Sequence, residues 1–282
     1  MTTKIIGDTF FVTLDSLKEF FSVSTNDQFP STGHPDNEND FNELIKEEKS
    51  SWRYGSEYTK NDFLKTRTDP AKGKRLCEES IKSTMADKSY RKLITQALTY
   101  KKKIKYKELG SRISVPRAIG GDDTYFITAK NSAKPTVKLA INMCVSAGCD
   151  DDMLMSIAQS AIPTIYALET AGICTEIWLC TFSCHAYDNN KGFHNDVTQV
   201  RIKSAQERFN WTTFAPVFTS GAYRHTFFLS WLIQEFRLMG GYGSPMSADT
   251  MKEHDNYGYA AIIGNNAPGP VKLVNEVFSK LK

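Results

Sequence analysis

The chain has 282 residues, of which 40% are hydrophobic and 12% aromatic, so it can bury a sizeable core and does not belong to the disordered class. Its formal charge is only +3, and any strong charge must therefore be local. No apolar run is long enough to cross a membrane, and the first residues lack the apolar core of a secretion signal, so we expect a cytoplasmic protein. The six cysteines are too few for a disulfide scaffold, which favours a reducing compartment.

In the first half of the chain, an acidic region with the composition of a loop interrupts the predicted strands and helices. Residues 1–50 hold ten acids against four bases, and the stretch from Ser22 to Asp40 is rich in turn-forming residues. A strand is expected at Lys4–Leu14 and a short helix from Asp15 onward. Further helices are expected at Asp40–Ser50, from Thr59 through Leu64, at Lys74–Asp87 and at Tyr90–Lys107.

Between Lys88 and Arg117 the chain carries ten basic side chains and one acid, Glu108, a net charge of +9. Tyrosines are interleaved with these charges. Such a stripe binds phosphates through counterion release, and planar rings can stack on unpaired bases. A solvated helix face is the alternative, although solubilising faces usually mix signs. The candidate nucleic-acid-binding residues are Lys88, Arg91, Lys92, Tyr100, Lys101, Lys102, Lys103, Lys105, Tyr106, Lys107, Arg112 and Arg117, with Arg53 and Tyr54 upstream.

From Pro135 the pattern becomes that of an α/β layer fold. Two apolar strands, Val137–Val145 and Ile173–Phe182, flank a helix that runs from Asp150 towards Glu169, with a kink or restart at Pro163 and a stop at Gly172. A connection of this length implies a right-handed crossover between parallel strands. The remaining expected elements are a strand at Val197–Lys203, a helix at Tyr223–Met239, a strand at Tyr259–Ile263 and a helix at Pro270–Leu281.

These elements predict a three-layer α/β fold with a mostly parallel central sheet and helices on both faces. The α-rich basic N-terminal region is expected to span residues 1–134, and the α/β domain residues 135–282. No cofactor is expected, because the Gly240–Pro245 loop follows a helix and lacks the Lys-Ser/Thr of a phosphate-binding loop.

The order strand, turn, helix, strand, with a late short strand, resembles the von Willebrand factor A family. Metal-binding members carry Asp-x-Ser-x-Ser after their first strand, whereas this chain has Asn142-Met143-Cys144-Val145-Ser146. Only the serine is kept, so we expect no divalent cation there. A zinc cluster at Cys174, Cys180, Cys184 and His185 is not expected either, because two of these cysteines lie mid-strand.

The segment Trp52-Arg53-Tyr54-Gly55 precedes the region that resembles a degenerate A-type domain. This order of features is similar to that in a group of phage proteins. The whole chain also resembles the Drc-type single-stranded-DNA-binding RNA polymerase cofactors of Schitoviridae phages. That resemblance implies a transcription or replication cofactor in the host cytoplasm, with single-stranded DNA and a phage RNA polymerase as partners. It leaves a homo-oligomer open, and DNA is not distinguished from RNA.

An alternative is a protein-interaction A-type domain that serves as an adaptor for an ATPase or another partner. We do not expect an enzyme, because none of the five histidines lies in a pattern that identifies a nucleophile.

Overall fold

The computed structural model describes residues 2–6, 9–19, 70–100, 105–107, 112–113, 119, 126–128, 135–143, 151–184, 195–207, 209–210, 244–245, 258–264 and 267–281. The helices expected at Asp40–Ser50, Thr59–Leu64 and Tyr223–Met239 lie outside these residues. The loop region from Ser22 to Asp40 lies outside them as well.

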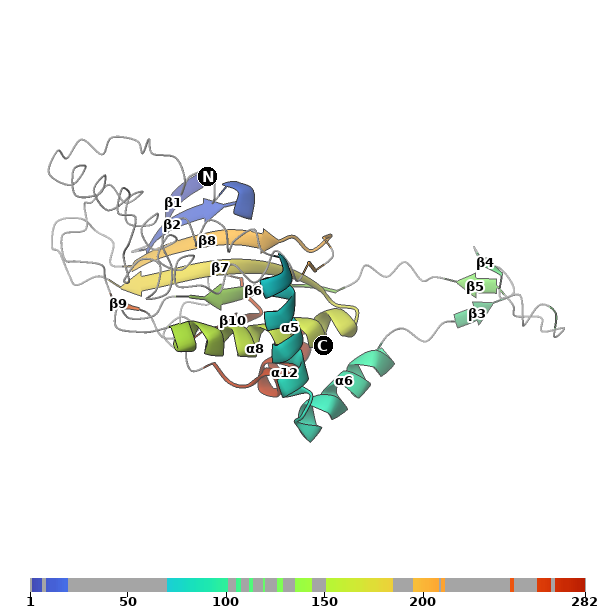
Figure 1. Cartoon of the computed structure of the whole chain (residues 1–282). Coiled ribbons are helices and arrows are strands. Elements are labelled where there is room, and N and C mark those ends of the chain that lie inside the picture. Colours follow the sequence, from blue (N-terminus) through green and yellow to red (C-terminus); the bar gives the residue numbers. More distant parts are fainter. Residues whose placement is uncertain are drawn as a thin grey trace, which may run out of the picture.

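A seven-stranded sheet organises the described part of the chain (Figure 1). Its strand order is β1-β2-β8-β7-β6-β10, and β9 pairs with β7 off this path. The strands are β1 (Thr2–Ile6), β2 (Thr9–Leu14), β6 (Thr136–Asn142), β7 (Cys174–Cys184), β8 (Asn195–Lys203), β9 (Ser244–Pro245) and β10 (Ala261–Ile263).

The predicted crossover between β6 and β7 is confirmed. The two strands are parallel, from Thr136 opposite Cys174 to Asn142 opposite Cys180, and α8 (Asp151–Thr170) connects them. The helix runs through Pro163 without a second helix being started there. It ends as predicted near Gly172, which has φ 81°.

The sheet is mixed, so the prediction of a mostly parallel sheet is wrong. Three pairs are parallel (β6 with β7, β10 with β6, β2 with β8) and three are antiparallel (β1 with β2, β7 with β8, β7 with β9). β7 and β8 are antiparallel because only residues 185–194 join them, which is shorter than a crossover connection requires.

The single strand expected at Lys4–Leu14 is two antiparallel strands. Ile6 pairs with Thr9, so only Gly7 and Asp8 separate them. Gly-Asp between two β-prone runs is a hairpin signal. Because β2 also pairs with β8, the sheet takes strands from both sides of residue 134. The division into regions 1–134 and 135–282 therefore stays a prediction about the sequence.

The described helices cover one face of the sheet (Figure 1). They are α5 (Pro70–Thr84), α6 (Lys88–Tyr100), α8 and α12 (Pro270–Lys280), and the main core lies between them and the sheet. A smaller apolar cluster that includes Phe11, Trp178 and Phe182 lies on the opposite face. A helix layer on that second face stays a prediction, because Tyr223–Met239 is outside the described residues. No helix in the described part of the chain is long and apolar enough to span a membrane.

The helix expected at Tyr90–Lys107 ends earlier. α6 stops at Tyr100, and Lys105–Lys107 forms β3, which pairs with β5 (Phe126–Thr128) in a second sheet that also contains β4 (Arg112–Ile113). The like charges of Lys101 with Lys105 and of Lys103 with Lys107 would lie four residues apart on a helix and repel each other. The alternating Lys-Tyr-Lys sequence instead suits a strand.

Candidate nucleic-acid interface

Helix α6 separates its charged and apolar side chains onto opposite faces. Asp87 precedes the helix, and its Oδ1 accepts a hydrogen bond from the Ser89 amide at 2.7 Å, as an N-cap residue does. Lys88, Arg91 and Lys92 are exposed. None of the three has an ion pair with an acidic side chain in the described part of the chain, so each can accept an external anion.

The opposite face of α6 anchors it to the core. Tyr90 is fully buried, and Leu93 and Ile94 are 4% and 7% exposed. The Tyr90 hydroxyl donates a hydrogen bond of 2.7 Å to the Pro163 carbonyl oxygen of α8. Burial, together with the neighbouring Tyr166, raises the pKa of Tyr90. Tyr90 therefore belongs to the core, and its ring is not available to stack on a base.

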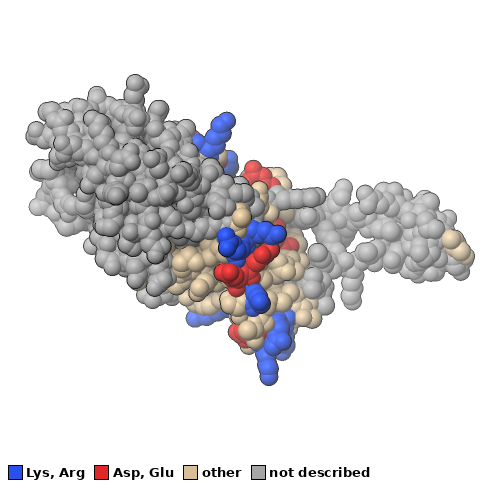
Figure 2. Space-filling view, viewed as in Figure 1, with Lys and Arg blue, Asp and Glu red and all other residues tan. Residues whose placement is uncertain are grey.

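The neighbouring helix α5 has a different charge pattern. Lys74, Arg75 and Lys82 are exposed, but so are Glu78 and Glu79, and Lys74 lies 3.6 Å from Glu78. Figure 2 shows both signs over α5, with blue side chains at the lower tip, where α6 begins. Of these two helices, α6 thus carries exposed cations and no acid, whereas α5 carries exposed side chains of both signs.

The other candidate residues are described only in part. Tyr100 lies in the last position of α6, and Lys105, Tyr106 and Lys107 form β3. Arg112 begins β4, and both Tyr106 and Arg112 are in register with Ile127 of β5, from opposite sides. The side chains of these residues are not described. The remaining candidates, Arg53, Tyr54, Lys101, Lys102, Lys103 and Arg117, lie outside the described residues.

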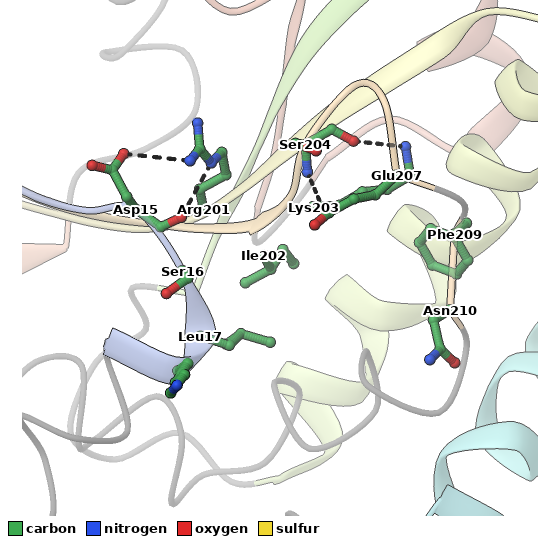
Figure 3. A pocket seen from close by; sticks show the side chains of 11 residues that line it. Asp15, Ser16, Leu17, Arg201, Ile202, Lys203, Ser204, Glu207, Phe209 and Asn210 are labelled. Atoms are coloured by element: carbon green, nitrogen blue, oxygen red, sulfur yellow. Dashed lines mark hydrogen bonds and ion pairs between the residues drawn. The ribbon is translucent and has the colours of Figure 1, made fainter.

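A pocket of about 550 Å³ lies where β2 and β8 end (Figure 3). Leu17, Ile202 and Phe209 line it and also pack against the main core. Its volume suits a small ligand. Its other lining residues are Asp15, Ser16, Lys18, Arg201, Lys203, Ser204, Glu207 and Asn210.

Most charged groups of this pocket already have protein partners. Arg201 Nη2 lies 3.7 Å from Asp15 Oδ1, and Lys203 Nζ lies 3.0 Å from Glu169 Oε1. Glu207 Oε2 accepts the Ser204 amide at 2.7 Å, which lowers the pKa of Glu207. Most charged groups that line the pocket are therefore already paired with other groups of the protein. We assign no catalytic role to it.

A third position of interest is the carboxyl edge of β6 and β10, where the strand order reverses. Across the sheet, the neighbouring strands are β8, β7, β6 and β10. Their order in the chain therefore runs backwards from β8 to β6 and then forwards to β10. Such reversals form ligand crevices in α/β sheets. Asn142 is 2% exposed there, and a Cβ on Gly264 would lie 3.2 Å from its Cβ. Ser146 lies outside the described residues.

The described residues do not provide a set of side chains that could bind a metal ion. Within the described ranges, no group of three or more His, Cys, Asp or Glu side chains is placed to hold a metal ion. Cys180 is fully buried, and burial raises its pKa to about 12, so the thiol stays protonated at neutral pH. Cys184 and His185 have no described side chains.

The sequence analysis missed several polar residues that the strands place in or near these sites. Lys138, Glu176, Arg201 and Lys203 lie within strands whose apolar content dominated the prediction. The available signal was their alternation with apolar neighbours, which places them on defined faces of a sheet.

Fold and surface together define an α/β protein with a mixed sheet, one described helix layer and a basic helix at its surface. The chain belongs to the family described as a domain of unknown function (DUF7192), whose profile matches residues 2–268. No curated protein and no solved structure matches the chain.

Proposed function

We propose that the protein binds single-stranded nucleic acid, with DNA as the expected ligand, and that the exposed face of α6 forms part of the binding surface. The observation that carries this proposal is the charge separation on α6. Lys88, Arg91 and Lys92 are exposed, whereas Tyr90, Leu93 and Ile94 hold the helix against the core. A rigid helix with cations on one face positions them for phosphates at little entropic cost.

The proposal extends along the chain from α6 through β3 to Arg117. Seven further bases, from Lys101 to Arg117, follow the helix in sequence. A strand of nucleic acid that neutralises several of them would bind with a strong salt dependence. Recruitment of a phage RNA polymerase, acting as a transcription or replication cofactor, is part of the same proposal. It is non-enzymatic binding, and it needs no metal or cofactor.

The test is fluorescence anisotropy with a labelled oligothymidylate and a matched duplex across a salt series. The Lys88→Ala/Arg91→Ala/Lys92→Ala variant should bind the single strand more weakly. Its slope of log affinity against log salt should fall by about 2, since each lost single-strand contact removes about 0.7. A second variant, Lys101→Ala/Lys103→Ala/Lys105→Ala, tests the continuation of the basic segment in the same way.

The matched control removes three exposed cations from the neighbouring helix, as Lys74→Ala/Arg75→Ala/Lys82→Ala. This variant has the same change in net charge but alters a surface of mixed sign, so its slope should change much less. Circular dichroism and thermal unfolding check that each variant is folded. Equal slopes for the α6 and α5 variants would mean that only net charge matters, and the assignment to α6 would be wrong.

A second candidate function is a protein-interaction A-type domain that serves an ATPase or another partner. The reversal of strand order between β6 and β10 favours it, because partners of such sheets bind at the carboxyl edge. Substituting Asn142 should then weaken partner binding and leave the salt dependence of DNA binding unchanged. Absence of DNA binding at low salt, combined with Mg²⁺-dependent partner binding, would favour this function over the first.

A further inference from the structure

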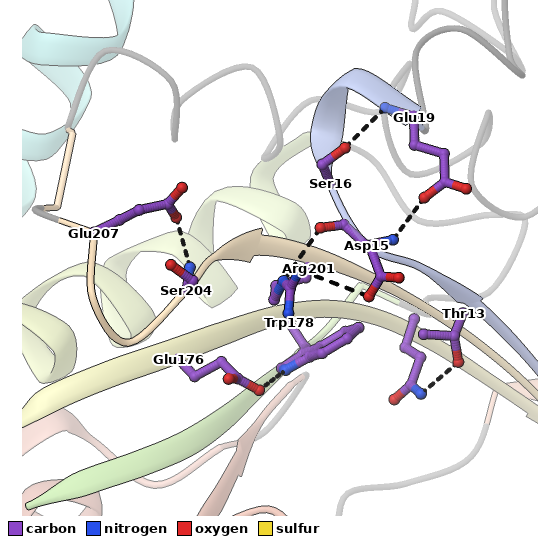
Figure 4. Close-up of polar contacts among 10 residues, drawn as sticks. Thr13, Asp15, Ser16, Glu19, Glu176, Trp178, Arg201, Ser204 and Glu207 are labelled. Atoms are coloured by element: carbon purple, nitrogen blue, oxygen red, sulfur yellow. Dashed lines mark hydrogen bonds and ion pairs between the residues drawn. The ribbon is translucent and has the colours of Figure 1, made fainter. Parts of the chain in front are cut away.

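The pocket at the ends of β2 and β8 has one wall made by the turn that follows β2. The Asp15 amide donates to Glu19 Oε2 at 2.7 Å, and the Glu19 amide donates to Ser16 Oγ at 3.1 Å (Figure 4). Arg201 joins this wall, because its Nε donates to the Asp15 carbonyl oxygen at 3.2 Å. The turn is therefore held in place by the protein's own hydrogen bonds.

The opposite wall is the turn that follows β8. Lys203 is 5% exposed, and its Nζ donates to the Ser204 carbonyl oxygen at 3.2 Å. The Ser204 amide in turn donates to Glu207 Oε2 at 2.7 Å. Figure 3 shows Arg201 and Glu207 on opposite sides of the pocket. Because both walls are already formed, a ligand would bind at a reduced entropic cost.

The floor between the walls is apolar. Leu17, Ile202 and Phe209 line the pocket and are only partly buried, although each packs against the main core. Leu17 and Ile202 lie between the two turns (Figure 3). An apolar floor that contains an aromatic ring suits the face of a flat ring system.

The first wall carries cations that can bind an anion. Lys18 is exposed, and it has no ion pair or hydrogen bond with another described residue. Arg201 Nη2 lies 3.7 Å from Asp15 Oδ1, and the Asp15 side chain is 64% exposed. That separation is longer than a hydrogen bond, and exposed ion pairs contribute little to stability. A phosphate group could therefore replace Asp15 beside the Arg201 guanidinium.

The second wall offers the opposite chemistry. Glu207 is exposed, and a carboxylate has about four acceptor sites, so it can accept further hydrogen bonds beside that of Ser204. A ligand that uses both walls needs an anionic group at one end, N–H donors at the other and a flat body between them. The two charges of an amino acid are attached to one carbon atom and cannot reach both walls.

We propose that this pocket binds a nucleoside monophosphate whose base carries an amino group. The phosphate lies against Arg201 and Lys18, the base covers the apolar floor, and its N–H groups donate to Glu207. No residue of α6 is among the described residues that line the pocket, so the site goes beyond the proposed function and does not depend on it. A free nucleotide and the 5′-phosphorylated end of a strand both supply this group.

The first test is isothermal titration calorimetry of the full chain with three ligands. Guanosine monophosphate should bind about tenfold more tightly than inosine monophosphate, which lacks the amino group, and than guanosine, which lacks the phosphate. Equal affinities for all three, or no binding of guanosine monophosphate at millimolar concentration, would overturn the proposal. A 5′-phosphorylated oligonucleotide that begins with guanine supports the strand end as the source if it competes, and the free nucleotide if it does not.

The second test uses variants of the two walls. Lys18→Ala should weaken guanosine monophosphate about tenfold and leave guanosine unchanged. Glu207→Gln, which can still accept the Ser204 amide, should lose most of the preference for guanosine monophosphate over inosine monophosphate. Lys272→Ala on exposed α12 is the control for Lys18→Ala and should bind as the parent does.

The triple variant of α6, Lys88→Ala/Arg91→Ala/Lys92→Ala, separates this site from the proposed nucleic-acid surface. It should bind guanosine monophosphate as the parent does. If it loses that affinity while Lys18→Ala retains it, the nucleotide binds at α6, and the pocket proposal fails while the proposed function stands. If the parent binds guanosine monophosphate but no oligothymidylate at low salt, the proposed function fails and the pocket proposal stands.

Discussion

At the scale of the residue, Lys203 shows how one buried charge joins three elements. It is 5% exposed, and its Nζ donates to the Thr175 carbonyl at 2.6 Å and the Ser204 carbonyl at 3.2 Å. It also lies 3.0 Å from Glu169 Oε1. The same carboxylate oxygen accepts the Thr175 amide at 3.1 Å. The pair thus ties the ends of β8 and α8 to the start of β7.

Lys203→Met should therefore destabilise the fold by about 3 kcal/mol, because it leaves the Glu169 carboxylate without its counter-charge and removes a donor from two carbonyl oxygens. Urea unfolding followed by circular dichroism measures the change. Lys203→Met/Glu169→Gln should recover part of the loss, since the uncompensated charge is gone. Lys272→Met on exposed α12 is the control and should stay within about 0.5 kcal/mol of the parent. A Lys203→Met protein as stable as the parent would show that the ion pair does not contribute to folding.

At the scale of the element, α8 ends in a Schellman motif. The Ile173 amide donates to the Leu168 carbonyl at 3.0 Å, and the Gly172 amide donates to the Glu169 carbonyl at 3.0 Å. Gly172 has φ 81°, a conformation that costs little only for glycine. This motif turns the chain directly into β7, so it fixes where the crossover ends.

Gly172→Ala should lower the free energy of unfolding by about 1 kcal/mol. A Cβ at Gly172 would meet nothing within 4 Å, so the cost is conformational and not steric. Gly172→Asn should cost less, because asparagine tolerates the left-handed region better. Thermal and urea unfolding of the two variants give the comparison. Equal losses for Ala and Asn would contradict the conformational explanation.

At the scale of the whole molecule, side chains that lose a proton at alkaline pH are buried in the helices α5 and α6 and in the strand β7. Cys77 of α5 and Cys180 of β7 are 1% and 0% exposed, and burial raises the pKa of each thiol to about 12. Tyr90 of α6 also has a raised pKa because it is buried. The native protein therefore keeps these groups neutral where an unfolded chain would ionise them.

The protein should lose stability as the pH rises from about 8.5 towards 12. The folded-state pKa of each thiol lies above its unfolded value, so this contribution is complete below the unfolded pKa and is lost above it. The loss should be about 1–2 kcal/mol per thiol by pH 10, seen as a falling midpoint in urea. Cys180→Ala should flatten the slope between pH 8.5 and 10 relative to the parent. In native protein at pH 8, iodoacetamide should label Cys77 and Cys180 only after unfolding, and rapid native labelling would contradict their burial.

The sequence alone determined the local features of this protein. Apolar runs located β6 and β7, the length of the intervening helix required them to be parallel, and glycine located the end of α8. Helical spacing placed Leu93 on the face of α6 opposite its cations. Each of these features depends on residues close together in the chain, and periodicity and chain length report such features directly.

The tertiary structure decided the pairing of distant segments. β2 joined β8 across the sheet, Lys105–Lys107 paired with β5 instead of extending α6, and Tyr90 became a core residue through its bond to Pro163. Lys203 met Glu169, and Lys138 came to lie over the ring of Tyr259, although more than a hundred residues separate the last two in the chain. These contacts depend on which strands become neighbours. The pairing of strands is decided by the apolar surface that the whole sheet buries. A local sequence pattern does not contain that information.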